Sequence, residues 1–143
     1  ENTLSKIRQF SSLISIEILE FQPYAEALRY QLNSHLLLLI VNIAEHEGGA
    51  QTMTGKFFEY LGAGRPILAL VPNGPLREII VKGRFGTVTP PKDILKIAEK
   101  FKRLYREWKS NGALKFDPDT DLRNSFTRKQ LTGRLAKIID KVT

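Results

Sequence analysis

The sequence predicts an α/β fold: one three-layer α/β/α domain in which a parallel sheet lies between two layers of helices. Two short apolar runs, residues 35–43 and 67–71, have the composition of strands that are buried on both faces. Segments with helical spacing of apolar residues alternate with such runs, and this alternation is typical of a parallel sheet covered on both faces. The 143 residues fit a single domain of ordinary size. We therefore expect one domain over residues 1–143.

The first part of the chain predicts the order helix, strand, helix, strand. Apolar residues have helical spacing at residues 4–10, and they mostly alternate at residues 14–21, where several are β-branched. Residues 24–32 predict a short helix. Residues 36–43 form the next strand, which is rich in leucine.

The central unit is a short helix that leads into a buried strand. Thr54 is a suitable N-cap, and residues 55–61 can form two helical turns. Gly62 and Gly64 supply the left-handed freedom that ends a helix. The apolar residues 67–71 then predict a strand, since they follow directly after a proline that forbids further helix.

The second half of the chain predicts more helix than strand. We expect a short helix at residues 76–81, a strand at 85–89, a long helix at 92–109 and a closing helix at 127–142. Residues 110–124 have little apolar content and predict an exposed, mobile loop. The long helix carries one apolar stripe that we expect to face the core: Ile94, Ile97, Ala98, Phe101, Leu104, Tyr105 and Trp108.

The composition limits the possible functions. The chain has no cysteine, which removes disulfides, thiolate catalysis and cysteine-bound zinc, and its two histidines are too few for a multi-histidine metal site. The net charge of +7 comes from 22 Lys and Arg against 15 Asp and Glu, and it favours an anionic partner. The charge alone does not choose among phosphates, acidic membrane surfaces and nucleic acid.

The hydropathy pattern predicts a soluble, cytoplasmic protein. The longest apolar run, residues 36–41, is far shorter than the roughly 18 residues that a membrane-spanning helix needs. No signal-peptide pattern opens the chain. The chain begins with Glu1 instead of methionine, so we expect a fragment of a longer protein.

A candidate anion site lies at the start of the central helix. Ligands of an open parallel sheet bind beyond the carboxyl ends of its strands, where a helix start presents backbone amides. Lys56 and the amides of residues 55–57 can meet a phosphate there, and Glu59 can accept hydrogen bonds from vicinal hydroxyls, as of a ribose. Lysine and glutamate at this spacing also occur on ordinary solvated helix faces, so their position at the sheet edge is what favours a site.

These residues resemble a known family. Residues 54–61, Thr-Gly-Lys-Phe-Phe-Glu-Tyr-Leu, and residues 62–69, Gly-Ala-Gly-Arg-Pro-Ile-Leu-Ala, are similar to the donor-binding motif of family 4 glycosyltransferases with the GT-B fold. The resemblance also covers residues 34–39 before the motif and residues 78–80 and 86–88 after it. Such enzymes have two Rossmann-like domains, and the C-terminal domain holds the nucleotide-sugar. The resemblance implies that this chain is most of that C-terminal domain, without the acceptor-binding N-terminal domain.

The resemblance also implies roles for individual residues. Glu59 matches the second glutamate of the Glu-x7-Glu motif of the family, which binds the ribose hydroxyls of the donor, and Thr54, Gly55 and Lys56 fall where the diphosphate would lie. The first glutamate of that motif, which contacts the donor sugar, is replaced by Gln51. An amide can still hydrogen-bond a sugar hydroxyl, but this departure leaves the donor sugar open. The resemblance assigns no catalytic residue to this chain.

The activity implied by the resemblance is transfer of a hexose from a nucleotide-diphosphate donor to a glycan or lipid-linked acceptor, with retention of configuration and without a metal or other cofactor. The fragment alone is expected to be inactive, because the acceptor domain is absent. A nucleotide-sugar epimerase of the same fold remains an alternative. So does a non-catalytic relative, in which Gln51 marks lost activity.

Other candidate sites are weaker. The spacing from Gly49 to Lys56 is one residue too long for a phosphate-binding P-loop, and Phe57 stands where serine or threonine must hold magnesium. We interpret His46 as a solvated loop residue and His35 as a structural residue. Basic residues in the last two predicted helices form solvated faces, or they contact an acidic membrane in the full protein. These basic residues are Lys96, Lys100, Arg103, Arg106, Arg128, Arg134 and Lys137. We expect no nucleic-acid binding.

Overall fold

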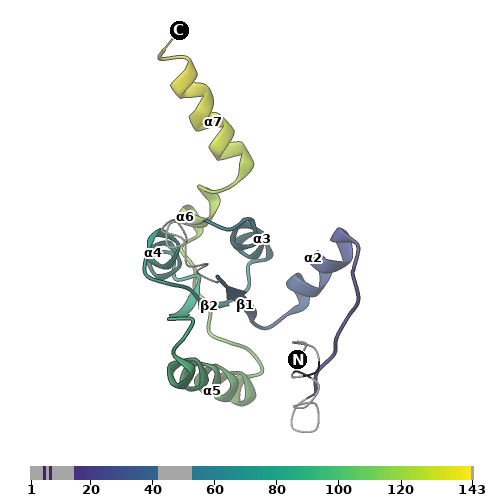
Figure 1. Cartoon of the computed structure of the whole chain (residues 1–143). Coiled ribbons are helices and arrows are strands. Elements are labelled where there is room, and N and C mark those ends of the chain that lie inside the picture. The colour runs from purple at the N-terminus through teal and green to yellow at the C-terminus, as the bar shows by residue number, and fades with distance from the viewer. Residues whose placement is uncertain (1–4, 6, 8–14, 42–52, 143) are drawn as a thin grey trace.

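The computed structural model contains a three-stranded parallel sheet with helices on both faces (Figure 1). The strands are β1 (Leu37–Ile40), β2 (Ile67–Leu70) and β3 (Gly86–Thr89), which lie side by side in chain order. The sequence prediction of a three-layer α/β/α fold with a parallel sheet is therefore confirmed. The structure describes residues 5, 7, 15–41 and 53–142.

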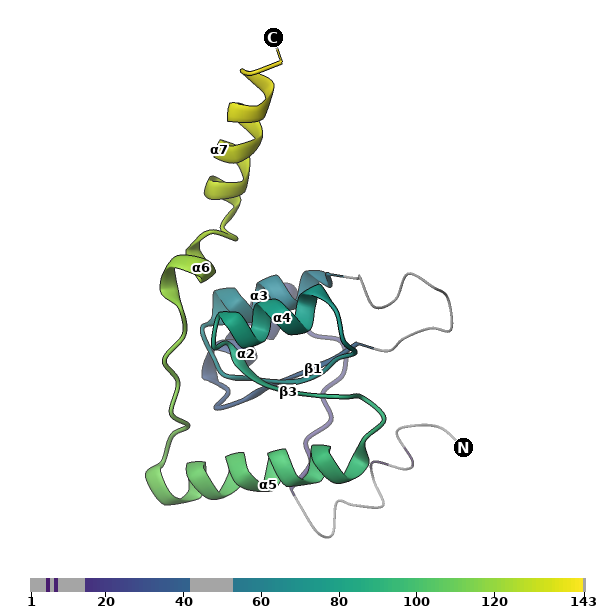
Figure 2. The same ribbon diagram turned by 90° about the vertical axis from the view of Figure 1, so that its left-hand side faces the viewer.

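The helices form the two outer layers. Figure 2 shows α3 and α4 on one face of the sheet and α5 on the other, while α7 points away from the sheet. The helices are α2 (Tyr24–Asn33), α3 (Gly55–Ala63), α4 (Pro75–Lys82), α5 (Ile94–Asn111), α6 (Thr120–Asn124) and α7 (Arg128–Ile139).

Local chemistry fixes both ends of α3. The Thr54 hydroxyl accepts a hydrogen bond from the Lys56 amide at 3.1 Å, which caps the first turn. The helix ends at Gly64, whose φ of 63° is left-handed and whose amide donates to the carbonyls of Tyr60 and Leu61. The predicted N-cap Thr54 and the role of Gly64 are confirmed, whereas Gly62 lies within the helix without a positive φ, so the prediction that it also ends the helix is wrong.

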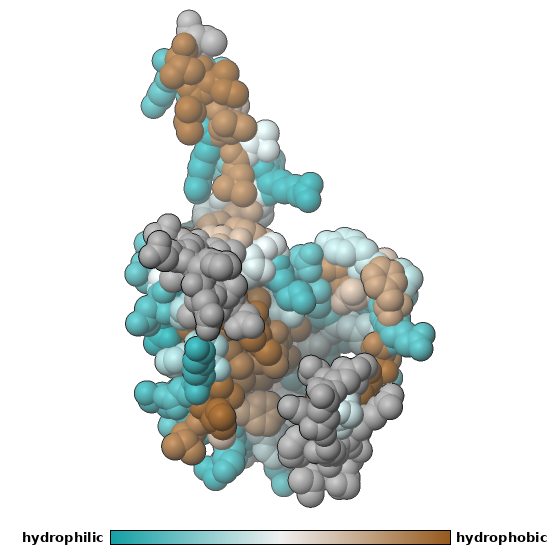
Figure 3. Space-filling view, in the orientation of Figure 1, coloured by the Kyte–Doolittle hydropathy of each residue, from teal (hydrophilic) through white to brown (hydrophobic). Residues whose placement is uncertain are grey.

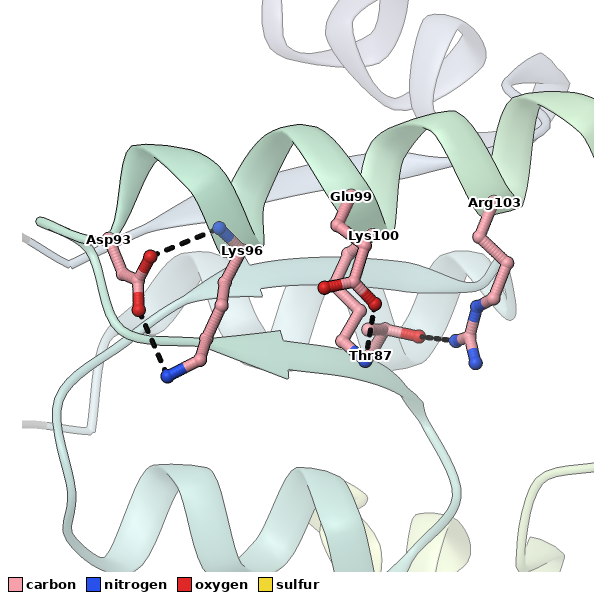
Figure 4. Close-up of polar contacts among 6 residues, drawn as sticks. All are labelled: Thr87, Asp93, Lys96, Glu99, Lys100 and Arg103. Carbon is pink, nitrogen blue, oxygen red and sulfur yellow. Dashed lines mark hydrogen bonds and ion pairs between the residues drawn. The ribbon is translucent and has the colours of Figure 1, made fainter.

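Polar contacts cap the start of α5 and join the helix to β3 (Figure 4). Asp93 caps the helix, since its carboxylate accepts from the Lys96 amide at 3.0 Å and pairs with the Lys96 ammonium at 3.0 Å. Further along, the Arg103 guanidinium donates to the Thr87 hydroxyl at 3.3 Å, which ties α5 to β3.

The core consists of one apolar cluster on each face of the sheet. The larger cluster joins the sheet to α3 and α4, and Phe57, Ile80 and Phe85 are almost fully buried in it. The smaller cluster joins Leu68 and Leu70 of β2 to Leu104 of α5. All residues of β2 are buried, and adjacent ones belong to opposite clusters because side chains alternate between the faces of a strand. Burial alternates in β1, where Leu38 and Ile40 are 50% and 59% exposed, so the prediction that this strand is buried on both faces is wrong.

The strand that the sequence predicts at residues 14–21 is not present in the part that the structure describes. Residues 15–23 have no regular secondary structure, and the side chain of Phe21 is 96% exposed. A strand needs a hydrogen-bonded neighbour, and β1 pairs only with β2 among the described residues. Alternating hydrophobicity alone therefore gave a wrong prediction here.

Two further predictions need correction. The apolar stripe of α5 is only partly core: Leu104 is buried, whereas Phe101 and Tyr105 are 53% and 50% exposed. A three-stranded sheet offers too little surface to cover the whole stripe. Residues 110–124 are not simply an exposed loop, because they include α6, which Asp119 caps at the Leu122 amide. Leu122 packs against the larger core cluster.

Candidate functional site

The candidate site lies where the strands end and the helices begin. Each of β1, β2 and β3 runs toward the same edge of the sheet, because all pairs are parallel. The next helix along the chain after each strand, α3, α4 and α5 respectively, starts from that edge. This is the edge at which open parallel sheets bind ligands.

The start of α3 presents one positively charged side chain and several backbone amides, some of which already donate hydrogen bonds within the helix cap. Lys56 is exposed and has no ion pair with any residue that the structure describes. The Lys56 amide already donates to the Thr54 hydroxyl, and the Phe57 amide donates to the Thr54 carbonyl at 3.1 Å. Of the three amides expected to meet a phosphate, two therefore have acceptors within the cap. An anion would be held mainly by the Lys56 ammonium and the positive end of the helix.

Glu59 lies one turn further along α3 and points toward α2. Its carboxylate accepts a hydrogen bond from the side-chain amide of Gln31 at 3.4 Å, across 28 residues of sequence. Glu59 is half-buried, and the side-chain Oε1 of Gln31 is buried without a partner in the described structure. A carboxylate has about four acceptor positions, so Glu59 keeps several for a ligand.

Tyr60 anchors this part of α3 to the sheet. Its hydroxyl donates to the carbonyl of Leu38 in β1 at 3.3 Å. Burial, and secondly the negative charge of Glu59, raise the pKa of the Tyr60 hydroxyl above its ordinary value of 10.0. Tyr60 therefore stays neutral at physiological pH and serves to hold α3 in place.

A groove of about 810 Å³ runs along the outer side of α3. Gly55, Glu59 and Gly62 line it from α3, Tyr24 from α2, and the opposite wall comes from α6, α7 and the residues between them. Arg123 supplies a positive charge from that wall. The groove thus brings a carboxylate and a guanidinium to one open, partly apolar channel beside the start of α3.

The remaining predicted positions fall into two groups. Thr54, Gly55, Lys56 and Glu59 lie together at the start of α3, as expected. Gln51 and the loop histidine His46 lie outside the described residues.

Within the described residues, no cluster of three or more acidic or histidine side chains could hold a metal ion. No helix among them is long and apolar enough to cross a membrane.

Sequence reasoning missed Gln31 and Arg123. Gln31 belongs to a helix that carried no motif, and only the packing of α2 beside α3 brings its amide to Glu59. Arg123 lies in a segment that was expected to be an exposed loop. No local pattern marks either residue.

No family model, curated protein or solved structure matches this chain in the three comparisons with known proteins.

Proposed function

We propose that this chain is the nucleotide-sugar-binding domain of a glycosyltransferase that moves a hexose from a nucleotide-diphosphate donor to a glycan or lipid-linked acceptor. The acceptor would bind to a second domain. The resemblance of residues 54–69 to a donor-binding motif motivates this proposal, and the geometry of α3 supports it.

The observation that carries the proposal is the position of Glu59. Its half-buried carboxylate lies one helical turn from Lys56, at the edge of the sheet where ligands bind, and Gln31 orients it. A phosphate at the helix start and a ribose one turn further along would match the order of these groups in a nucleoside diphosphate. A carboxylate that accepts from two vicinal hydroxyls selects a ribose over a simple phosphate.

In the proposed reaction, this domain positions the donor and stabilises the leaving group. Lys56 and the positive end of α3 would offset the negative charge that grows on the departing diphosphate. Glu59 would fix the nucleoside so that the sugar faces the acceptor. These roles need no protein-bound metal.

Calorimetric titration with uridine, guanosine and adenosine diphosphates and their sugar conjugates tests the proposal. We expect one nucleotide to bind selectively. Glu59→Ala should weaken binding by about tenfold to a hundredfold, since a hydrogen bond to a charged group contributes about 1.5–3 kcal/mol. Lys56→Ala should weaken the diphosphate forms about tenfold and the free nucleoside hardly at all.

Glu99→Ala and Lys102→Ala are matched controls. They remove the same two residue types, also three positions apart, from α5 on the opposite face of the sheet. We expect both controls to bind like the wild-type chain. If the α3 and α5 variants lose affinity equally, binding reflects net charge and not a site on α3, and the proposal is wrong.

A further inference from the structure

Helix α7 leaves the body of the molecule with its apolar side chains exposed. Figures 1 and 2 show it projecting beyond α6, away from the sheet. None of its residues is buried, and the two core clusters include no residue from it. Leu135 and Ile138 are 57% and 60% exposed, and Val142 just after the helix is 80% exposed.

These apolar residues form one stripe. They recur three or four positions apart, which places them on the same side of a helix. Figure 3 shows the stripe as a continuous hydrophobic surface along the projecting segment. The stripe consists of Leu131, Leu135, Ile138, Ile139 and Val142.

The rest of this segment is strongly basic. Between residues 128 and 142 there are five Lys and Arg against a single acidic residue, so the segment has a net charge of +4. At 100° per residue, Lys137 and Lys141 point away from the centre of the stripe, whereas Arg134 borders the stripe and Arg128 falls within it. An apolar stripe bordered by a Lys/Arg-rich face is the pattern of helices that lie in the interface of a membrane.

We propose that α7 binds the surface of a bilayer that contains anionic lipids. Leu135, Ile138 and Val142 enter the boundary between headgroups and acyl chains, and the basic side chains contact the lipid phosphates. This inference is independent of the proposed catalytic function.

The charge distribution favours an anionic bilayer over two other partners. Two copies of α7 that paired along their stripes would bring Arg128 and Arg134, which lie in or beside the stripe, close to the same residues of the other copy, and the like charges would repel. A nucleic acid would satisfy the basic face but leave the stripe in water. Of these three partners, an anionic bilayer is the one that satisfies both faces at once.

Vesicle flotation of the full chain tests the proposal. We expect binding to vesicles of phosphatidylcholine with phosphatidylglycerol, weaker binding in high salt, and at least tenfold weaker binding to phosphatidylcholine alone. The double substitution Leu135→Gln/Ile138→Gln should lower binding at least tenfold, and Arg134→Gln/Lys137→Gln should lower it about tenfold. All variants should melt at the wild-type temperature, because α7 contributes no buried residue.

Lys102→Gln/Lys109→Gln is the matched control, because it removes two exposed charges from α5. It should bind within about twofold of wild type, since these charges lie away from the proposed lipid contact. Equal binding to neutral and anionic vesicles, or binding that survives loss of the stripe, would overturn the proposal. A dimer in sedimentation experiments that Leu135→Gln/Ile138→Gln dissolves would instead assign the stripe to a second copy.

Discussion

Gly86 lies opposite Ile67 of β2 and has a φ of 158°, a conformation that residues with side chains rarely adopt. A Cβ atom at this position would overlap the backbone of Ile67, the residue directly opposite in β2. Because the obstacle is backbone and not a flexible side chain, the two strands would have to separate. Glycine is therefore required here for the sheet that carries the candidate site.

We predict that Gly86→Ala lowers the free energy of unfolding by about 3 kcal/mol or more. Gly62→Ala is the matched control: Gly62 is helical, a Cβ there would meet nothing within 4 Å, and alanine should raise stability by up to about 1 kcal/mol. Urea unfolding measures both changes. Similar effects of the two substitutions would contradict the close strand approach.

Tyr60 gives the fold a dependence on alkaline pH. Its folded-state pKa is raised above 10.0, so the folded chain keeps this proton at pH values where the unfolded chain has lost it. Its contribution is complete below about pH 10.0 and is lost as the pH rises through the folded-state pKa. The difference in unfolding free energy between wild type and Tyr60→Phe should therefore be constant below pH 10.0 and fall above it. A difference that does not change with pH would show that Tyr60 is not protected from ionisation.

At the scale of elements, the local signals in the sequence identified most helices and strands. Thr54 and Gly64 fix the ends of α3 through hydrogen bonds to residues only a few positions away, so both ends can be predicted from the local sequence. The end of α2 was predicted to within a residue, and β2 was found from its apolar run directly after Pro66, although its hydrogen bonds are to distant strands. The predictions that were wrong concerned segments whose structure depends on contacts with residues far along the chain.

Long-range contacts explain the errors. Residues 15–23 have the composition of a strand, but pairing depends on a neighbouring strand and not on composition. α6 is held by the Asp119 amide, which donates to the Gly83 carbonyl at 2.9 Å from 36 residues earlier in the chain. In the candidate site, Lys56 and Glu59 could be predicted because one helix carries both, whereas Gln31 could not.

Phe126 fastens the segment between α6 and α7 to α3. Its ring lies 5.8 Å from that of Phe58 and 6.4 Å from that of Phe57, measured between centroids. We predict that Phe126→Ala costs about 2 kcal/mol and releases α6 from the core. Hydrogen exchange at the Leu122 amide should accelerate, while exchange in α5 stays as in wild type. Equal acceleration in both helices would indicate global destabilisation and contradict a local anchor.

At the scale of the whole molecule, the charge and the apolar surface are distributed unevenly. The sheet and its two helix layers present a groove with Glu59 and Arg123 on one side, and the basic helix α7 extends from the same side (Figure 1). A second groove of about 460 Å³ lies near the amino ends of the strands and contains Arg84 and Arg103. The net charge of +7 predicted an anionic partner, but it could not choose between these two places.

We propose that the start of α3 binds a nucleoside diphosphate. The most direct test is an NMR titration of the ¹⁵N-labelled chain with the nucleotide that binds best in calorimetry. We predict the largest shifts at the backbone amides of Gly55 and Lys56 and at the side-chain amide of Gln31. Largest shifts around Arg84 and Arg103 in the second groove, with those at α3 unchanged, would contradict the claim.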